Sequence, residues 1–555
     1  MWALFSKLKS WTIRFWQSFS AVGLLMGTLF FAVSLTPSLL PRTFIMQGTL
    51  SGVSLALGYA VGILGLWLWD YLEVPRLAPR VEKKAKVVSA LIFAIIAAIF
   101  LRQTADWQNT VRTLMDLEPV ASAHPTKIGL IALSVFTIVI ALARLVDLIF
   151  RFVSEKLDHV VPRRISRVVS IVIVGTLVWS AIDGVIFQVG LRAADASFKA
   201  LDKLVEADVD QPADPNKTGS AASRIKWKEL GRRGRDYISK APRRQEIETF
   251  TGRPAQEPMR VYVGLTTADT ARQRARLALE ELKRVGAFDR SVLIIVTPTG
   301  TGWVDPSGMD TIEYLHNGDV ASVAVQYSYL PSWLSLLVEP GYGADAAIAL
   351  FNEVYRHWSG LPPDRRPKLY LHGLSLGALS SELSGELIDI IGDPYHGALW
   401  AGPPFASRMW RSVSQDRHPD SPAWLPRFRD GSIIRFTSQT NALAIPGARW
   451  GRLRYVYLQY ASDPIVFFRP ESLYQQPDWM KQPRGPDVSS ALQWYPIVTF
   501  LQLALDMAVA TTTPIGYGHV YAPEHYIDAW VEVTAPDGWN EPDIERLKDH
   551  FRGRT

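Results

Sequence analysis

Long apolar runs fill the first third of this chain and constrain its fold more than any other feature. A helix needs roughly 20 apolar residues to cross a bilayer, and five runs reach or approach that length. A buried helical core is the alternative, but the charged loops between the runs favour membrane spans. We predict an N-terminal α-helical transmembrane bundle over residues 1–195, with spans at residues 17–39, 46–69, 85–101, 128–150 and 168–190.

The loops between these runs differ in their content of Lys and Arg, and this difference predicts the orientation. The loops on the amino-terminal side carry thirteen basic residues, whereas the opposite loops carry four. The bias places the amino terminus in the cytoplasm, and five spans then place everything after residue 190 outside it. One miscounted helix would reverse this orientation.

The overall composition excludes several classes of function. The chain has no cysteine, so disulfides, thiolate catalysis and iron–sulfur clusters are excluded. Its net charge of +6 comes with no basic block interleaved with aromatics, so we expect no nucleic-acid partner. We find no phosphate-binding loop and no cluster of metal ligands, and His396 and His418 are isolated. We therefore expect neither a cofactor nor a metal.

The remaining chain alternates between short β-rich runs and helical stretches. Residues 196–256 are rich in Asp, Pro, Lys, Arg and Gly and read as a linker or edge segment. From 257 to 555 the alternation predicts a doubly wound, mostly parallel α/β domain, in which ligands bind at the carboxyl ends of the strands. The expected strands are residues 260–265, 291–297, 320–327, 368–373, 397–402, 431–438 and 454–460.

A catalytic serine is predicted at the end of the fourth of these strands. The sequence KLYLHGLSLGALSSE places Ser375 in a G-x-S-x-G turn between a strand and a helix. Gly373 and Gly377 allow the sharp turn that exposes a nucleophilic serine above a sheet. A small-residue turn that only packs a helix on a strand is the alternative.

A serine nucleophile needs a base and an acid, which follow it in chain order in this arrangement. Asp463 stands in the turn ASDPIV after the last predicted strand, where the acid is expected, although an Asx turn would also explain it. Three histidines follow it. His519 in GYGHVY is the preferred base, His525 resembles the start of a helix, and His550 lies among terminal charges.

An oxyanion hole is expected from two backbone N–H groups. One is that of Leu376, the residue after the nucleophile. The other is expected from the Gly-rich loop TPTGTGWVDP after the second predicted strand, within Gly300, Thr301, Gly302 and Trp303. The alternative is a glycine-rich turn without a catalytic role.

Several long blocks of this sequence together resemble a bacterial family of α/β-hydrolases that carry an N-terminal multi-span membrane domain. Members have an acidic residue before the nucleophile, where this chain has Leu374. The resemblance implies a serine hydrolase of the α/β-hydrolase type in the bacterial inner membrane, and it implies no particular substrate. The blocks are SLTPSLLPR, GRRGRDYI, TPTGTGWVDP, EYLHNGDVASVAVQYSYLPSW, RPKLYLHGLSLGALSSE, LWAGPPF and GYGHVY.

Two apolar stretches bear on the substrate. Residues 327–343 follow a strand and offer Tyr329, Leu330 and Trp333 as a lid or an acyl-chain wall. Residues 491–510 lie between the predicted acid and base and are interrupted by a proline and an aspartate. Packed core or cap helices are the alternative for both. With the bilayer as a partner, we expect an acyl ester of a lipid or lipid-like molecule as substrate.

Two alternatives to ester hydrolysis stay open at this stage. The same residues would make an acyltransferase if an alcohol replaced water. A membrane transport or scaffold protein with a non-catalytic binding domain is a different class, and Arg144 and Asp147 in the fourth run are the residues that suggest it.

Overall fold

The computed structural model describes residues 19–75, 79–159, 161–180, 202, 209–330, 335, 340–385 and 390–554. The chain divides into two compact units, and neither is one continuous stretch of sequence. The first unit is formed by Met1–Gln188, Arg469–Met480 and Val488–Val509, and the second by Val189–Phe468, Lys481–Asp487 and Ala510–Thr555. Two segments of the predicted catalytic domain, 469–480 and 488–509, therefore belong to the first unit.

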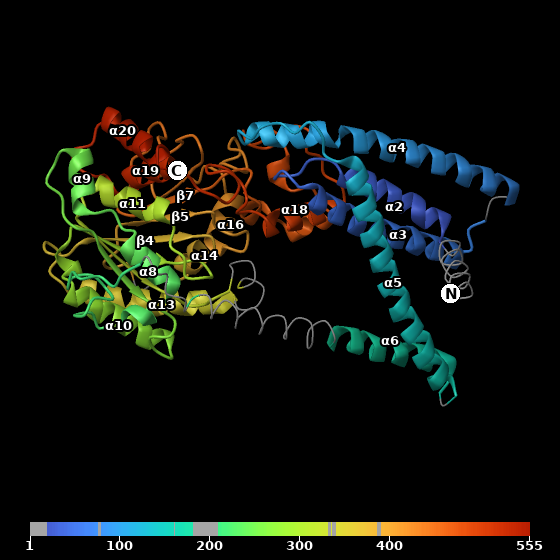
Figure 1. The fold of residues 1–555 in the computed structure, drawn as a ribbon, viewed down its shortest axis with the longest axis horizontal. Helices are drawn as coiled ribbons and strands as arrows, with labels where there is room; N and C mark the ends of the chain where they lie inside the picture. The colour runs from blue at the N-terminus through green and yellow to red at the C-terminus, as the bar shows by residue number, and fades with distance from the viewer. Residues whose placement is uncertain are drawn as a thin grey trace. The chain divides into compact units, whose positions relative to one another are not determined.

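The first unit is helical (Figure 1). α3 packs against both α2 and α5, and α18 contacts α2 and α3. Small residues allow the close approach of α2 and α3: a Cβ at Gly27 would lie 2.7 Å from the Leu55 carbonyl oxygen. The elements of the first unit are α2 (Ala21–Ser34), α3 (Phe44–Tyr71), α4 (Pro79–Leu114), α5 (Pro125–Asp158), α6 (Arg163–Trp179), η4 (Pro470–Leu473), η5 (Asp478–Met480) and α18 (Val498–Ala508).

Three helices among the described residues are long and apolar enough to cross a membrane: Phe44–Tyr71, Lys84–Leu114 and Pro125–Asp158. They correspond to the second, third and fourth predicted spans. The first predicted span contains only the 14-residue α2, which ends at Ser34 rather than at 39. The fifth contains most of the 17-residue α6, and residues 181–190 of that span lie outside the described residues.

The two charged residues that suggested transport have partners within the first unit. The Arg144 guanidinium lies over the ring of Phe19, 4.7 Å from its centroid. Asp147 pairs with Arg151 one turn later on α5, and both side chains of that pair are largely exposed.

The second unit is built on a seven-stranded parallel sheet in the order β1-β3-β2-β4-β5-β7-β6. All seven predicted strands are present, which confirms the α/β prediction. β4 lies at the centre, with β2 and β5 as its neighbours. The strands are β1 (Met259–Val263), β2 (Val292–Thr297), β3 (Val320–Val325), β4 (Lys368–Leu374), β5 (Gly397–Ala401), β6 (Ile434–Thr437) and β7 (Arg454–Leu458).

Helices cover both faces of this sheet (Figure 1). α10 packs on α13 and α13 on α14, while α11 and α20 both pack on α19. Because every strand is parallel, all carboxyl ends and the loops that follow them lie along one edge. The elements are η2 (Trp227–Glu229), α8 (Gly231–Ser239), α9 (Arg244–Thr251), α10 (Ala271–Arg284), η3 (Ala287–Asp289), α11 (Pro306–Leu315), α13 (Pro340–Ser359), α14 (Leu376–Glu382), α16 (Arg408–Gln415), α17 (Pro464–Phe467), α19 (Pro523–Thr534) and α20 (Glu541–Arg552).

Part of the predicted linker is ordered structure. α8 and α9 lie within residues 196–256, and α8 contacts β1. Tyr237, Ile238 and Ile247 are buried. The buried residues of α8 recur at helical spacing and pack on β1, the edge strand of the sheet; they are Gly231, Gly234, Arg235, Tyr237 and Ile238.

Candidate active site

Ser375 occupies a strained turn between β4 and α14. Its backbone has φ 58° and ψ −125°, a conformation that a non-glycine residue rarely adopts. Such strain costs of order 1–3 kcal/mol and persists only where the surroundings enforce it. The Ser375 amide donates to the Ala401 carbonyl at 3.0 Å, which ties the turn to the end of β5. The serine is 4% exposed.

The two glycines of the G-x-S-x-G sequence are required by close backbone contacts. A Cβ at Gly373 would lie 2.4 Å from the carbonyl carbon of Gly377. A Cβ at Gly377 would lie 2.1 Å from the carbonyl oxygen of Thr297, the last residue of β2. These contacts leave no room for a side chain and bring the start of α14 against the end of β2.

Asp463 and His519 form a buried pair. His519 Nδ1 lies 2.7 Å from Asp463 Oδ2, and the residues are 7% and 0% exposed. Asp463 follows β7 and caps α17, and its Oδ1 accepts a hydrogen bond from the Ile465 amide at 2.8 Å. The Asx turn that was the alternative role for Asp463 is therefore present together with the contact to His519, through the other oxygen of the carboxylate.

Gly402 brings this pair to the serine turn. It directly follows Ala401, which accepts the Ser375 amide. Gly402 has φ +51°, and a Cβ there would lie 2.6 Å from His519 Cε1. The imidazole therefore lies directly on the backbone at the end of β5. Among the described residues, His519 Nε2 is buried and has no hydrogen-bond partner.

Tyr521 also contacts the carboxylate, a role that was not predicted from the sequence. Its hydroxyl donates to Asp463 Oδ2 at 2.7 Å. Burial and the nearby Asp463 carboxylate raise the pKa of Tyr521 well above its usual value, so the phenol stays protonated as a donor. The only signal in the sequence is its place two residues after His519, within a run of aromatic residues.

A second buried carboxylate, Asp487, connects the segments that carry Asp463 and His519. Its Oδ2 accepts from the Ser462 hydroxyl at 2.6 Å and from Gln439 Nε2 at 2.6 Å. The Ser462 hydroxyl in turn accepts from the Gly518 amide at 3.0 Å. Ser462 precedes Asp463 and Gly518 precedes His519, so this network fixes the separation of the two segments. No sequence signal distinguished Asp487.

The loop after β2 lies beside the start of α14 and has a defined turn. The Thr299 amide donates to the Trp303 carbonyl at 2.9 Å, and the Gly302 amide donates to the Thr299 carbonyl at 2.8 Å. The Tyr262 hydroxyl donates to the Gly302 carbonyl at 2.7 Å and fixes the loop to β1. Leu376 is the first residue of α14, where backbone N–H groups lack partners within the helix. The Gly302 amide, in contrast, already has a hydrogen-bond partner inside the turn, the Thr299 carbonyl.

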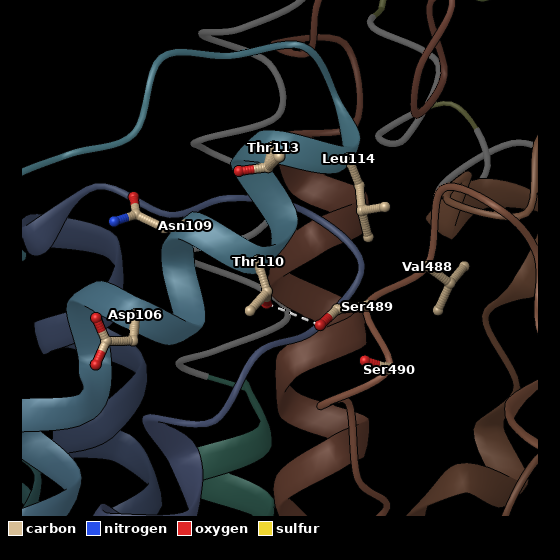
Figure 2. Close-up of a pocket in the computed structure, with 8 residues that line it drawn as sticks. All are labelled: Asp106, Asn109, Thr110, Thr113, Leu114, Val488, Ser489 and Ser490. Atoms are coloured by element: carbon tan, nitrogen blue, oxygen red, sulfur yellow. Dashed lines mark hydrogen bonds between the residues drawn. The ribbon is translucent and has the colours of Figure 1, made fainter.

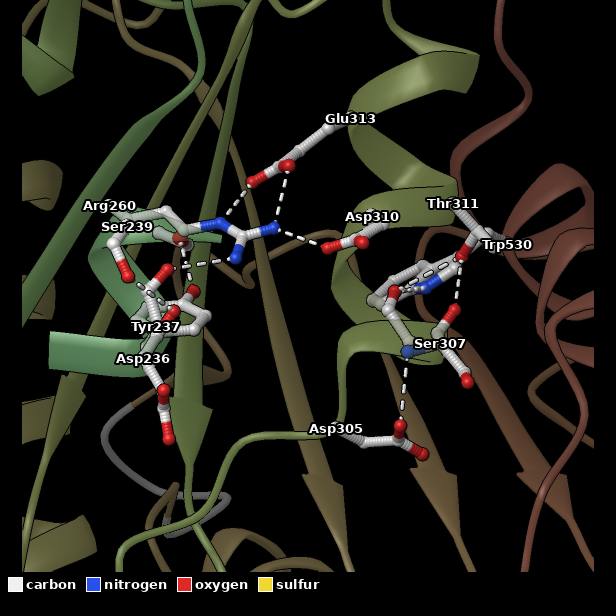
Figure 3. A network of polar contacts seen from close by, with 12 residues as sticks. Asp236, Tyr237, Ser239, Arg260, Asp305, Ser307, Asp310, Thr311, Glu313 and Trp530 are labelled. Carbon is white, nitrogen blue, oxygen red and sulfur yellow. Dashed lines mark hydrogen bonds and ion pairs between the residues drawn. The ribbon is translucent and has the colours of Figure 1, made fainter. Parts of the chain in front are cut away.

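The far end of this loop is held by Asp305, the N-cap of α11 (Figure 3). One oxygen accepts from the Ser307 amide and the other from the Tyr526 hydroxyl, both at 3.0 Å. Burial raises the pKa of Asp305 to about 6. Asp305 therefore fixes the direction in which the loop enters the helix.

α11 is itself held on the sheet by a buried ion network (Figure 3). Arg260 of β1 donates from Nε and Nη2 to both oxygens of Glu313, each at 2.8 Å. It also donates from Nη2 to Asp310 at 2.6 Å and from Nη1 to the Tyr237 carbonyl of α8 at 2.9 Å. The network joins β1, α8 and α11 beneath the loop.

The predicted substrate residues are only partly described. Tyr329 and Leu330 are 9% and 3% exposed, and most of residues 331–339 lie outside the described residues. The Leu330 amide donates to the Ser328 hydroxyl at 3.0 Å. Trp333 lies outside the described residues.

The other late histidines have different surroundings. His525 lies in the first turn of α19, and its Nδ1 lies 2.6 Å from the Tyr460 hydroxyl. Burial lowers the pKa of His525 to about 4. His550 packs on Phe250, with 4.7 Å between ring centroids. Among the described residues, no group of three or more His, Cys, Asp or Glu side chains is arranged to hold a metal ion.

The first unit contains a separate pocket of about 540 Å³ (Figure 2). It lies between the C-terminal end of α4 and the start of the segment 488–509. Thr110 and Ser489 both line it, and their hydroxyls are 2.8 Å apart. Hydroxyl and amide groups predominate among the lining residues, which are Asp106, Asn109, Thr110, Thr113, Leu114, Val488, Ser489 and Ser490.

Comparison with protein families gives a match in each half of the chain. Residues 259–547 match an alpha/beta-hydrolase family, and residues 35–242 match an alpha/beta-hydrolase family N-terminus. No curated protein and no solved structure matches the chain. The first match includes Ser375, Asp463 and His519 and covers more than half of the chain, so this protein belongs to that alpha/beta-hydrolase family.

Proposed function

We propose that this protein is a membrane-anchored serine hydrolase that cleaves an acyl ester through an acyl-enzyme. One observation carries the proposal. The Asp463–His519 pair packs on Gly402, next to the Ala401 carbonyl that accepts the amide of Ser375. A nucleophile, a base and an orienting acid at one sheet edge are the parts that acyl transfer needs.

In the first step, Ser375 Oγ attacks the carbonyl carbon of the ester. With its Nδ1 proton directed at Asp463, His519 has an unprotonated Nε2 that takes the serine proton. The Asp463 carboxylate then stabilises the imidazolium. The unpartnered, buried Nε2 supports this role. A buried nitrogen without a hydrogen-bond partner costs free energy, and a catalytic role explains why the protein keeps it.

The negative charge that forms on the carbonyl oxygen requires backbone donors. Leu376 provides one at the N-terminus of α14, where the helix dipole also favours negative charge. For the second donor we propose Thr301 or Trp303, because the Gly302 amide already donates to Thr299. Removal of one oxyanion donor typically costs a factor of about 10²–10³ in rate.

The remaining steps restore the enzyme. The tetrahedral intermediate collapses, the ester C–O bond breaks, and His519 gives its proton to the leaving alkoxide, which departs as an alcohol. Water then attacks the acyl-serine and gives a proton to His519. Collapse of this second intermediate releases a carboxylic acid and returns the proton to Ser375.

We propose that the substrate is a lipid or lipid-like ester. The support is the three apolar helices of the first unit, which are compatible with a membrane anchor. Tethering to a bilayer raises the effective concentration of a membrane-borne substrate. The proposed location is the bacterial cytoplasmic membrane, with the second unit on its extracytoplasmic face. The Lys and Arg bias of the loops supports this orientation, which requires α2 and α6 each to belong to a span.

Ester hydrolysis by the full-length protein in detergent tests the proposal. We expect cleavage of p-nitrophenyl esters over a series of acyl chain lengths, with increasing kcat/KM towards longer chains. Ser375→Ala and His519→Ala should each lose at least about a thousandfold in kcat. Ser381→Ala, a buried serine on the same helix, is the matched control and should keep its activity. Hydrolysis that survives in Ser375→Ala contradicts the mechanism, and a preference for the shortest chains contradicts the lipid substrate.

A further inference from the structure

A buried carboxylate of the second unit, Asp487, takes no direct part in the proposed acyl transfer. It ends the segment Lys481–Asp487 and is 3% exposed. Its Oδ2 accepts from Gln439 Nε2 at 2.6 Å, from the Ser462 hydroxyl at 2.6 Å and from the Ser462 amide at 3.2 Å. Gln439 follows β6 and Ser462 follows β7, so one oxygen joins three segments of the second unit.

The Ser462 hydroxyl extends this contact to the segment that carries His519. A hydroxyl has one proton to donate, and Asp487 Oδ2 receives it. The oxygen of the same hydroxyl accepts from the Gly518 amide at 3.0 Å. Ser462 is completely buried, so solvent offers no replacement partner for these groups. Asp487 therefore sets the direction of the hydroxyl that holds the Gly518 amide.

These contacts lie one residue away from the proposed acid and base. Ser462 precedes Asp463, and Gly518 precedes His519. The hydrogen bond between Ser462 and Gly518 therefore joins the same two turns as the 2.7 Å contact between the carboxylate and the imidazole. Loss of this bond would free the backbone on both sides of that contact.

A second contact ties the network to the histidine segment. Gln439 Nε2, which donates to Asp487, also donates to the Gly516 carbonyl at 3.3 Å. The segment is closely packed at Gly518, where a Cβ would lie 2.7 Å from the Thr513 hydroxyl oxygen. Asp487 thus holds the two glycines before His519 through two side chains that both donate to it.

We propose that Asp487 is a positioning residue for the Asp463–His519 pair and acts through the Ser462 hydroxyl. This inference rests on the proposed function, and all of its contacts lie within the second unit. With the Asp487 carboxylate in place, the two turns have one separation, and His519 has one position relative to Asp463. A base displaced by about 1 Å can cost a factor of about 10² in rate even when the change is far from the chemistry.

The test uses the full-length protein in detergent with a fluorophosphonate probe. The final extent of labelling counts folded active sites, and the rate of labelling per site reports the reactivity of Ser375. We expect Asp487→Ala to label to the same extent per folded molecule, but roughly tenfold to a hundredfold more slowly. In ester hydrolysis, kcat should fall by a similar factor with KM within about twofold of the wild-type value, because a positioning residue acts on the rate rather than on substrate binding.

The variant Ser462→Ala tests the route through the hydroxyl. It deletes one oxygen and should slow labelling by a similar factor, and it carries the test if Asp487→Ala does not fold. The double variant Asp487→Ala/Ser462→Ala should be no slower than the slower single variant, since both changes break the same connection.

A conservative variant and a matched control complete the set. Among the described residues, Asp487 Oδ1 is buried and has no hydrogen-bond partner. In Asp487→Asn the amide nitrogen can take the place of Oδ1 while the amide oxygen keeps the contacts with Ser462 and Gln439, and labelling should stay within about threefold of the wild-type rate. In the control Asp393→Ala, the lost carboxylate is one that Arg366 holds at 2.6 Å near the amino ends of β4 and β5, and the labelling rate should not change.

The outcomes separate this inference from the proposed function. Labelling of the wild type with an unchanged rate per site in Asp487→Ala or Ser462→Ala overturns the positioning role alone. A double variant whose loss equals the product of the two single losses also overturns it, because the two residues would then act independently. Failure of the wild-type protein to label overturns the proposed function, and this inference with it.

Discussion

Tyr521 donates its hydroxyl to Asp463 Oδ2 at 2.7 Å, the same oxygen that lies 2.7 Å from His519 Nδ1. The other carboxylate oxygen accepts the Ile465 amide at 2.8 Å. The carboxylate is thus held by three groups and cannot rotate without breaking one of them. In this arrangement the Tyr521 phenol orients the Asp463 carboxylate, and the carboxylate orients the His519 imidazole.

Removal of this phenol should weaken catalysis without unfolding the protein. Tyr521→Phe keeps the ring, which stacks on Tyr460 with 4.4 Å between centroids. It loses one hydrogen bond to a charged group, and we expect kcat to fall by roughly tenfold, equivalent to about 1.4 kcal/mol. The matched control is Tyr395→Phe, which loses a buried hydroxyl bonded to Tyr455 outside the site. Equal activity of Tyr521→Phe and wild type would show that the phenol does not orient the acid.

The turn that carries Ser375 should not tolerate a side chain at Gly377. A Cβ there would lie 2.1 Å from the Thr297 carbonyl oxygen, which is backbone and cannot rotate away. Gly377→Ala must displace β2 or α14, and we expect the free energy of unfolding to fall by about 1–3 kcal/mol with loss of esterase activity. A Cβ at Gly392 meets no atom within 4 Å, so Gly392→Ala is the control. Chemical denaturation followed by tryptophan fluorescence measures both, and equal stability of the two variants would contradict the close contact.

The sequence predicted the sheet well because its signals are local. Buried parallel strands appear as short apolar runs, and all seven runs became strands. The turn around Ser375 could be predicted equally well, since glycines at this fixed spacing leave the backbone few possible conformations. The adjacent order of β5 and β7, with β6 at the edge, depends on non-local packing and has no local signature.

The features missed from the sequence depend on distant partners. Asp506 interrupts an apolar stretch, and nothing near it in the chain indicates a pairing with Arg42, 464 residues away. Asp487 resembles any loop aspartate until Ser462 and Gln439 are placed around it. Tyr521 is one of several aromatic residues near His519. Polar groups that orient a site gain their roles only when the fold is complete.

Glu382 at the end of α14 should make stability depend on pH. Burial raises the pKa of this carboxyl to about 8, although the Tyr457 hydroxyl donates to it at 2.9 Å. The native state therefore keeps a proton that the unfolded state releases near the ordinary glutamate pKa. Its contribution to the unfolding free energy is complete at low pH and is lost as pH rises towards 8, by on the order of 5 kcal/mol in total.

The variant Glu382→Gln isolates this effect. Glutamine does not ionise, so the difference in unfolding free energy between variant and wild type should shift in favour of the variant from pH 6 to pH 9. Urea denaturation at the two pH values measures it. A difference that is constant with pH would show that Glu382 is ionised in the folded protein throughout this range.

The absence of cysteine makes the orientation of the second unit directly measurable. Asp420 has a side chain that is 81% exposed, and Asp420→Cys should react with a membrane-impermeant maleimide on intact spheroplasts. Arg164→Cys, in a loop predicted to be cytoplasmic, should react only after permeabilisation. Protection of Asp420→Cys on intact spheroplasts would place the second unit in the cytoplasm. Arg164→Cys would then also be protected if the fifth predicted span does not cross, and would react if one of the first four does not.

The most direct test of the central claim is to identify the residue that a fluorophosphonate modifies. The purified wild-type protein is labelled, digested and analysed by peptide mass spectrometry, with Ser375→Ala and His519→Ala in parallel. We predict an adduct on Ser375 in the wild type, no adduct in Ser375→Ala, and labelling at most about a thousandth as fast in His519→Ala. An adduct on another serine, or no adduct under conditions that label a known serine hydrolase, would contradict the account.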